Sequence, residues 1–363
     1  MAVHNNAGGP DYPEQAKTLR AVHHDLRSAQ SWMETICGPH QLQVSSPQRL
    51  QFRHSATVLR SMSTVIGEIQ YGTDVRIGIE EAQLNCFSIS LPLTGEQELR
   101  LPAGTALSNI NHAVIISPNM RQELTIAGNC SKLQVAIGRD VLHKVLEELL
   151  MRPVLQPLVF DATMQVNEGA AASWWRMVRF LIQEMEHSPR LLNEDPVSRD
   201  IERALIKGLI LCQPSNYSCE LATPSEARYP QYLRRACEFI REHAKDDVQL
   251  VDMERASGVS HSTLYDAFRR HFGMSTTQYL KHYRLQAVRQ ALLEGPIKQN
   301  ISTIAMGCGF THMGRFSSDY RKAFAEAPSD TLERRRDCLS SSYSAGAAKS
   351  VGGLFTECTT IVD

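Results

Sequence analysis

The same helix–turn–helix pattern occurs twice in this chain, once within residues 248–270 and again within residues 301–322. Each copy has an apolar residue, then a glycine five positions later, then another apolar residue. These triplets are Met253, Gly258 and Val259 in the first copy and Ile304, Gly309 and Phe310 in the second. Further along, Leu264 corresponds to Phe316 and Phe268 to Tyr320, so the offset rises from 51 to 52 residues and the second turn is one residue longer.

Each shared position has a physical role in such a pair of helices. Glycine in left-handed geometry ends the first helix without a Cβ clash, and Ser260 or Thr311 can cap the second helix. Residues four apart, such as Leu264 and Phe268, face the core together, which leaves the opposite face free to enter a DNA major groove. The alternative is two ordinary helical hairpins without a partner. Two copies at one spacing, each ending in a basic pair, favour DNA binding.

Residues 233–332 resemble the DNA-binding domain of AraC/XylS-type transcription regulators. The matching motifs are Thr263-Leu264-Tyr265…Phe268-Arg269…Phe272-Gly273 and Ile304-Ala305…Cys308-Gly309-Phe310…Arg315-Phe316…Tyr320-Arg321…Phe324…Pro328. Between the copies, the 17 residues 277–293 resemble the family's rigid connecting helix, which would span about 26 Å. A helix of that length would hold two recognition helices roughly one DNA turn, about 34 Å, apart.

The resemblance implies which side chains contact DNA. Those expected to read bases are Ser262, Tyr265, Asp266, His312, Met313, Arg315 and Ser318. Those expected to contact phosphates, which position a protein without specifying sequence, are Arg269, Arg270, Lys281, Arg284, Arg321 and Lys322. Arg315 is the leading base reader, since an Arg–guanine pair contributes about 1–3 kcal/mol of discrimination. A phosphate contact is the alternative role for Arg315.

Three positions depart from the family's pattern. Asp266 stands where family members often place Arg, and it would either accept a hydrogen bond from cytosine N4 or weaken the first reader. Glu254 stands where Ala is usual. Because a buried unpaired carboxylate is costly, we expect Glu254 to reach solvent or to pair with Arg255 or a nearby histidine. Ser275-Thr276 replaces the family's usual Ser-Pro.

Residues 50–137 have a different texture, with short β-prone segments separated by glycine-containing turns. An alternation typical of a half-buried strand occurs in Lys132, Leu133, Gln134, Val135, Ala136 and Ile137. Many short strands at this spacing predict a small antiparallel sandwich or barrel. The region also resembles the cupin-like sensing domain of XylS-type activators, through Ile66-Gly67…Tyr71-Gly72, Ser90-Leu91-Pro92-Leu93…Gly95 and Ile116-Ser117-Pro118.

The β region lacks the sequence patterns of catalysis and metal binding. Metal cupins need an HxH pair, a Glu and a further His, whereas His112 stands alone. Neither a G-x-S-x-G motif nor a phosphate loop occurs, so we expect no enzyme activity, metal or cofactor. A carboxylate effector would need Arg or Lys in an apolar pocket. The effector-binding residues stay unknown, because a solvated surface role is the more natural one for Arg49, Arg53, Arg60 and Arg76.

Amphipathic helices are predicted at 140–151, 170–186 and 197–212, and in the family such helices often dimerise. One apolar stripe consists of Trp174, Val178, Leu181 and Met185. The predicted organisation is a sensing and dimerisation domain at 1–212, a linker at 213–230, a DNA-binding domain at 231–338 and a disordered tail at 339–363.

Composition favours a protein of the reduced cytoplasm. All nine cysteines are isolated, without a CxxC pair, so neither disulfides nor zinc sites are indicated. The N-terminal residues do not resemble a secretory signal, and no apolar run suggests a membrane span. The net charge of −1 is unevenly divided, because residues 229–338 carry 17 Lys and Arg against 13 Asp and Glu. A basic module on an acidic body is typical of DNA binding by one half.

These features predict an α+β protein of two domains: an N-terminal antiparallel β-barrel of cupin-like type with helices, and an all-α tandem helix–turn–helix domain. The expected function is a cytoplasmic, sequence-specific transcription activator that binds double-stranded promoter DNA and RNA polymerase. A small-molecule effector, for which the resemblance implies an aromatic acid, would control it, with a homodimer as an open possibility. Two alternatives stay open: a ligand-independent DNA-binding protein whose barrel only dimerises, and a cupin-class enzyme fused to a DNA reader.

Overall fold

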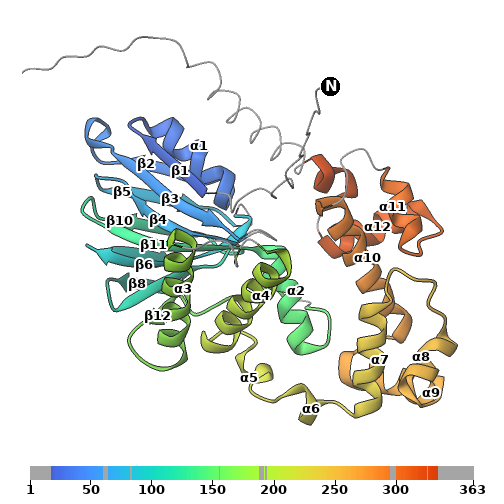
Figure 1. The fold of residues 1–363 in the computed structure, drawn as a ribbon. Helices are drawn as coiled ribbons and strands as arrows, with labels where there is room; N and C mark the ends of the chain where they lie inside the picture. Colours follow the sequence, from blue (N-terminus) through green and yellow to red (C-terminus); the bar gives the residue numbers. More distant parts are fainter. Residues whose placement is uncertain are drawn as a thin grey trace, which may run out of the picture. The chain divides into compact units, whose positions relative to one another are not determined.

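The chain forms two compact units, called unit 1 and unit 2 below. A computed structural model describes residues 18–59, 64–81, 84–154, 156–187, 192, 194–294, 300–324 and 326–333. Unit 1 comprises Met1–Leu150 with Val154–Thr223, and unit 2 comprises Met151–Pro153 with Pro224–Asp363. Unit 1 contains both strands and helices whereas unit 2 is helical (Figure 1), as the α+β prediction requires.

The boundary between the units falls inside the predicted linker, 213–230, and the first half of that segment is not a linker. Gln213 is 3% exposed and Tyr217 is 7% exposed, and a short helix, α5 (Ser218–Leu221), follows in unit 1. The Gln213 side chain donates to the carbonyls of Asp161 and Thr163, so a glutamine typical of loops is here part of the unit 1 fold. The predicted tail, 339–363, lies outside the described residues.

Unit 1 is built on two antiparallel sheets. The strands of the seven-stranded sheet, in spatial order, are β1 (Thr18–His23), β3 (Phe52–Val58), β4 (Thr64–Gln70), β11 (Ser131–Gly138), β6 (Cys86–Thr94), β9 (His112–Ile116) and β12 (Thr163–Gln165). Those of the five-stranded sheet are β2 (Gln41–Val44), β5 (Val75–Ile79), β10 (Gln122–Ile126), β7 (Gln97–Leu101) and β8 (Gly104–Ser108). Each sheet keeps two edge strands among the described residues, so the predicted barrel is an open two-sheet sandwich.

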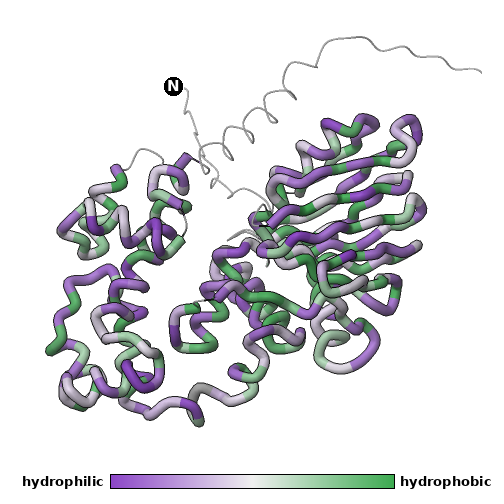
Figure 2. The backbone as a smooth tube through the Cα atoms, turned by 180° about the vertical axis from the view of Figure 1, so that it is seen from behind, coloured by the Kyte–Doolittle hydropathy of each residue, from purple (hydrophilic) through white to green (hydrophobic). Residues whose placement is uncertain are grey.

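The central strands β11 and β6 of the seven-stranded sheet are buried on both faces, which corrects the prediction of a half-buried β11. Leu133, Val135 and Ile137 pack in one apolar cluster with the helices, whereas Ala136 packs in a second cluster between the two sheets. Lys132 is on that second face and is only 4% exposed. Figure 2 shows hydrophilic and hydrophobic residues alternating along the strands of unit 1. In β11 that alternation separates two buried environments rather than core from solvent.

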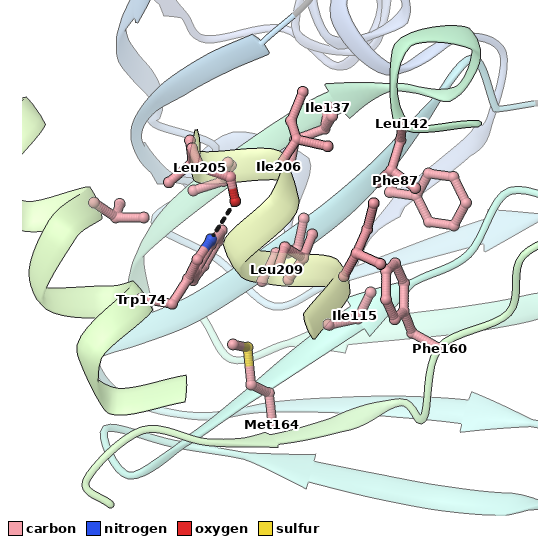
Figure 3. Packing of buried hydrophobic residues seen from close by; sticks show 14 of the residues in the cluster. Phe87, Ile115, Ile137, Leu142, Phe160, Met164, Trp174, Leu205, Ile206 and Leu209 are labelled. Carbon is pink, nitrogen blue, oxygen red and sulfur yellow. Dashed lines mark hydrogen bonds between the residues drawn. The ribbon is translucent and has the colours of Figure 1, made fainter. Parts of the chain in front are cut away.

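Three helices cover the outer face of the seven-stranded sheet, close to where the apolar stripes predict them: α2 (Arg139–Leu150), α3 (Gly169–His187) and α4 (Asp195–Cys212). Trp174, Val178 and Leu181 of the predicted stripe are buried, and Figure 3 shows Trp174 against α4, where its indole Nε1 donates to the Leu205 carbonyl at 2.8 Å. Truncating a core tryptophan to alanine typically costs about 3–5 kcal/mol. The helix α1 (Leu26–Cys37) packs instead on the apolar cluster between the two sheets, through Ala29, Met33 and Cys37.

Unit 2 consists of two small helical cores joined by one long helix. The helices are α6 (Ser225–Arg228), α7 (Gln231–Glu242), α8 (Leu250–Ser257), α9 (His261–Phe272), α10 (Thr276–Glu294), α11 (Ile301–Gly307) and α12 (Met313–Phe324). The connecting helix α10 contributes Tyr279 and Tyr283 to the first core and Leu285, Val288 and Leu292 to the second. Because one continuous helix is buried in both cores, it fixes how the two helix pairs are placed.

Candidate functional site

The turn of the first helix pair has the predicted geometry. Gly258 follows α8 in the left-handed region, with φ of 78°. The Ser260 side chain then accepts a hydrogen bond from the Thr263 backbone N–H and caps α9. Leu264 and Phe268 are 1% and 0% exposed, so the remaining face of α9 is left to solvent, as the repeat predicts.

Glu254 pairs with a nearby histidine, one of the partners expected for it, but through the backbone of that residue. Its half-buried carboxylate accepts a hydrogen bond from the backbone N–H of His261 at 2.5 Å. Arg255, the other expected partner, lies instead 3.7 Å from Asp252. His261 is the first residue of α9, where backbone N–H groups lack helical acceptors and the helix dipole favours negative charge. Glu254 of α8 therefore caps α9 from outside that helix.

The exposed face of α9 carries the predicted residues Ser262, Tyr265, Asp266, Arg269 and Arg270. The Arg269 Nε donates to the Tyr265 hydroxyl at 3.3 Å, and its guanidinium lies 5.6 Å from the centre of that ring. Within the described part of the chain, the Asp266 carboxylate makes neither a hydrogen bond nor an ion pair. An exposed carboxylate without a partner is available to a hydrogen-bond donor.

The second helix pair repeats this arrangement with a later helix start. Gly309 has φ of 79°, but α12 begins at Met313, two positions after Thr311, which was a predicted cap. Met313 is half-buried and packs against the second core. The other residues predicted to contact DNA from this copy are exposed: His312, Arg315, Ser318, Arg321 and Lys322.

Two predicted phosphate ligands on α10 are engaged within unit 2. Lys281 Nζ lies 3.1 Å from Asp319 Oδ2 of α12. The half-buried Arg284 donates to the carbonyls of Ala244 at 3.3 Å, Asp246 at 3.1 Å and Gly309 at 3.5 Å. Arg284 therefore ties the loop after α7 to the turn of the second helix pair. For both residues, phosphate contact stays a prediction.

Gly309 is needed at this tie for two reasons. Its φ is in the left-handed region, and a Cβ added there would lie 2.7 Å from the Arg284 Cζ. Only a residue without a side chain permits both the turn and the close approach of the guanidinium.

A second site, also missed from the sequence, is a small cavity between the two sheets of unit 1. It has a volume of about 40 Å³ and is lined by Met33, Cys37, His40, Ile69, Tyr71, Ile77, Ile79, Leu84, Ser88, Ile116, Leu124, Lys132 and Gln134. Burial lowers the pKa of Lys132 to about 8. The sequence carries no signal of this cavity, because the alternation of Lys132 and Gln134 with apolar residues is also what a strand with one solvent-facing side shows.

Three of the arginines considered for an effector, Arg49, Arg53 and Arg76, do not line this cavity. Arg49, Arg53 and Arg76 are exposed, as their surface interpretation requires, and Arg60 lies outside the described residues. No cluster of three potential metal-binding His, Cys, Asp or Glu side chains occurs in the described ranges. Among the helices so described, none is long and apolar enough to cross a membrane.

Comparisons with known proteins agree with this division of the chain. Residues 29–211 match the family model of the AraC-binding-like domain, and residues 253–334 match that of a helix-turn-helix domain. The probable thc operon regulatory protein of Rhodococcus erythropolis is 24% identical, over 89% of this chain and 97% of that protein. The XylDLEGF operon transcriptional activator 1 of Pseudomonas putida is 23% identical, over 86% of this chain and 94% of that protein.

Among solved structures, the AraC-like transcriptional activator CuxR matches 74% of this chain and 94% of its own, at 12% identity and a TM-score of 0.42. The AraC-binding-like match covers half of the chain and the helix-turn-helix match follows it. The chain therefore belongs to the AraC/XylS family of DNA-binding transcription regulators.

Proposed function

We propose that one chain places both of its recognition helices in successive major-groove segments of promoter DNA. The observation that carries this proposal is α10, whose 19 residues are packed into both helical cores. A straight helix of that length spans about 28 Å, close to the roughly 34 Å of one DNA turn. The spacing of the two readers would then be set by packing rather than by a flexible linker.

The base readers in this proposal come from the exposed faces of α9 and α12. Arg315 is exposed and has no partner among the described residues, so its guanidinium is available for guanine O6 and N7. Asp266 is available in the same way for cytosine N4. Ser262, His312, Met313 and Ser318 complete the set, and Tyr265 offers a ring to a thymine methyl. Arg269, Arg270, Arg321 and Lys322 lie in the last turns of the two helices as phosphate contacts.

We further propose that the protein is a cytoplasmic activator under effector control, without enzymatic activity of its own. Activation is supported by the Pseudomonas putida relatives, which are named operon transcriptional activators, and RNA polymerase as the partner follows from the family resemblance. An aromatic acid as effector and a homodimer through the helices of unit 1 follow from the family resemblance.

Genome-wide capture of DNA fragments by the purified full chain tests this function. We expect enrichment of fragments with two half-sites about one turn apart, and a change in that enrichment with one acid from a panel of aromatic acids. Enrichment that ignores every acid would favour the ligand-independent alternative. Absence of enrichment would contradict the DNA-binding proposal itself.

The enzyme alternative has a separate test. Elemental analysis of the purified full chain, combined with oxygen-uptake assays on the same acids, should find neither stoichiometric metal nor turnover. Bound metal together with turnover would overturn the assignment as a regulator without enzymatic activity.

A further inference from the structure

The end of α1 and the start of β6 bring two buried cysteines together. Cys37 is the last residue of α1 and Cys86 is the first residue of β6, and they are 7% and 3% exposed. The Cys37 carbonyl accepts a hydrogen bond from the Asn85 backbone N–H at 2.9 Å. The Cys86 Sγ lies 4.0 Å from the same carbonyl oxygen. Two cysteines that are far apart in the sequence therefore contact each other inside unit 1.

The contact between these two segments suits a disulfide. Extended segments joined by backbone hydrogen bonds place facing Cα atoms about 4.5–5.5 Å apart, and a disulfide joins Cα atoms about 4.4–6.8 Å apart. The two side chains also face each other, because the Cys86 thiol donates a hydrogen bond to the Cys37 sulfur. Both residues are free thiols in the structure, so the pair is in its reduced form.

The two thiols differ in acidity. The hydrogen bond from Cys86, followed by the charge of Lys132 and a hydrogen bond from the Gln134 side chain, lowers the pKa of the Cys37 thiol, whereas burial opposes that shift. The same hydrogen bond, together with burial, raises the pKa of the Cys86 thiol. The thiolate is the nucleophilic form of cysteine. Cys37 is therefore the reactive member of the pair, and Cys86 keeps its proton.

Lys132 supplies a buried positive charge to this pair. It is 4% exposed, its Nζ donates to the uncharged side chain of Gln97 at 3.0 Å, and none of the carboxylates in the described residues pairs with it. A buried ammonium is costly unless an opposite charge compensates it. Because a pKa of about 8 leaves Lys132 largely protonated at neutral pH, a Cys37 thiolate compensates that charge and is stabilised by it.

A small oxidant fits beside the Cys37 sulfur. Cys37 lines the cavity between the sheets, and the volume of about 40 Å³ is that of roughly three water molecules. Hydrogen peroxide has two heavy atoms and fits such a space. Three other buried cysteines lack this setting, because burial raises the pKa of Cys130, Cys237 and Cys308.

We propose that Cys37 and Cys86 form a peroxide-sensitive pair, whose oxidation ties α1 to β6 through a disulfide. The Cys37 thiolate attacks one oxygen of hydrogen peroxide, the O–O bond breaks, and the released hydroxide takes up a proton to give water. The Cys86 sulfur then attacks the Cys37 sulfenic acid, the S–O bond breaks, and hydroxide leaves with the proton of Cys86 as a second water. The two thiols lose two electrons and the peroxide gains them. Disulfides in a reducing compartment are typically transient and redox-sensing, and a small dithiol reverses them by exchange.

Oxidation changes the cavity as well as the two cysteines. The disulfide removes the negative charge that compensates Lys132. It also fixes the end of α1, which contributes Met33 and Cys37 to the lining. The pair therefore couples the redox state of unit 1 to the charge and the shape of this cavity.

Mass spectrometry of the full chain tests the pair directly. The reduced chain is treated with increasing doses of hydrogen peroxide, then unfolded in an alkylating reagent and digested. We expect a disulfide-linked pair of peptides that contain Cys37 and Cys86, at doses that leave the exposed Cys219 alkylated. Dithiothreitol should restore both thiols. Oxidation of Cys219 before the pair, or absence of the disulfide between Cys37 and Cys86 at every dose, would overturn the proposal.

Single variants assign the two roles. Cys86→Ser should stop at a Cys37 sulfenic acid, which a dione reagent traps, whereas Cys37→Ser should leave Cys86 reduced. Lys132→Met should slow the oxidation of Cys37 at pH 7 at least about threefold, because the charge that favours the thiolate is lost. The exposed control Arg49→Met should keep the rate of the unaltered chain.

The serine variants nearly keep the size of the side chain, so the assignment does not depend on the folding of Lys132→Met. If Cys86 in Cys37→Ser is oxidised as fast as Cys37 in Cys86→Ser, Cys37 is not the nucleophile and the proposal is wrong. An unchanged rate in a folded Lys132→Met chain would contradict the part assigned to the lysine.

Discussion

At the scale of single residues, the polar groups that matter most here have partners in another helix or loop. Glu254 departs from the family's pattern, yet it holds the start of α9 through the His261 backbone. Arg284 donates hydrogen bonds to three backbone carbonyls, two in the loop after α7 and one in the turn of the second helix pair. A nearby histidine was expected as a partner of Glu254, whereas the partners of Arg284 do not follow from local sequence, because they depend on how helices pack. The exposed residues of α9 and α12 were predictable, since helical periodicity alone decides which side chains face away from a core.

Arg315 provides the clearest residue-scale prediction. In the unaltered chain the Arg315 guanidinium would pair with a guanine edge. Arg315→Ala should therefore remove the preference for that base pair, which corresponds to about 1–3 kcal/mol of binding free energy. Lys322 lies about two turns further along α12. Lys322→Ala should instead weaken binding to all sequences about equally. Competition binding against a library of randomised sites measures both. If Arg315→Ala keeps its sequence preference, the placement of α12 in the groove is wrong.

His54 provides a prediction for acid stability. Burial lowers the pKa of His54 to about 4 from 6.5, and its Nδ1 accepts a hydrogen bond from Trp32 Nε1 at 3.1 Å. The unfolded chain binds a proton at His54 more readily than the folded chain does. The contribution of His54 to the free energy of unfolding is therefore fully present above pH 6.5 and is lost as pH falls toward 4. The loss is on the order of 3 kcal/mol.

Urea unfolding at pH 7.5 and pH 4.5 should therefore show a larger acid destabilisation for the unaltered chain than for His54→Gln. An exposed control, His24→Gln, should behave like the unaltered chain. Equal acid sensitivity of all three chains would show that His54 is not the titrating group.

At the scale of elements, β11 shows both the reach and the limit of sequence patterns. Its alternation correctly separates Leu133, Val135 and Ile137 from Lys132 and Gln134. Periodicity assigns residues to faces, but it does not say what covers each face. Here helices cover one face and the second sheet covers the other, so a strand that looks half-buried is fully buried. The three-residue strand β12 lies outside the region 50–137 that was predicted to form strands, for a related reason: pairing with β9, not propensity, makes it a strand.

The turn between α11 and α12 provides an element-scale prediction. Gly309→Ala should destabilise the second helix pair by about 1–3 kcal/mol, because its φ of 79° is strained for alanine and the new Cβ meets Arg284. Gly314→Ala is the matched control, since it lies in α12 with open space around it. That change should be neutral or stabilising by up to about 1 kcal/mol. Thermal unfolding of both variants checks this, and a Gly309→Ala chain as stable as Gly314→Ala would contradict the proposed tie.

At the scale of the whole molecule, the two units differ in their charge and in their secondary structure. Residues 229–338 carry the excess of Lys and Arg over Asp and Glu, whereas unit 1 holds the buried Lys132 between two sheets. The fold class and the tandem reader were predictable, because repeats and strand patterns are local. The cavity was not, because Lys132 becomes unusual only when a second sheet and α1 enclose it.

We propose that α10 holds the two DNA-reading helices, α9 and α12, at a fixed distance. This proposal is tested most directly by changing the spacing between the two half-sites in the DNA. Affinity of the full chain should be measured for a captured operator, and for versions with 5 or 10 base pairs inserted between its half-sites. We predict that both insertions reduce affinity to about that of one half-site, since a single helix buried in two cores cannot lengthen. Undiminished affinity with the 10-base-pair insertion would contradict the account, because it would mean that the two readers are flexibly joined or belong to different chains.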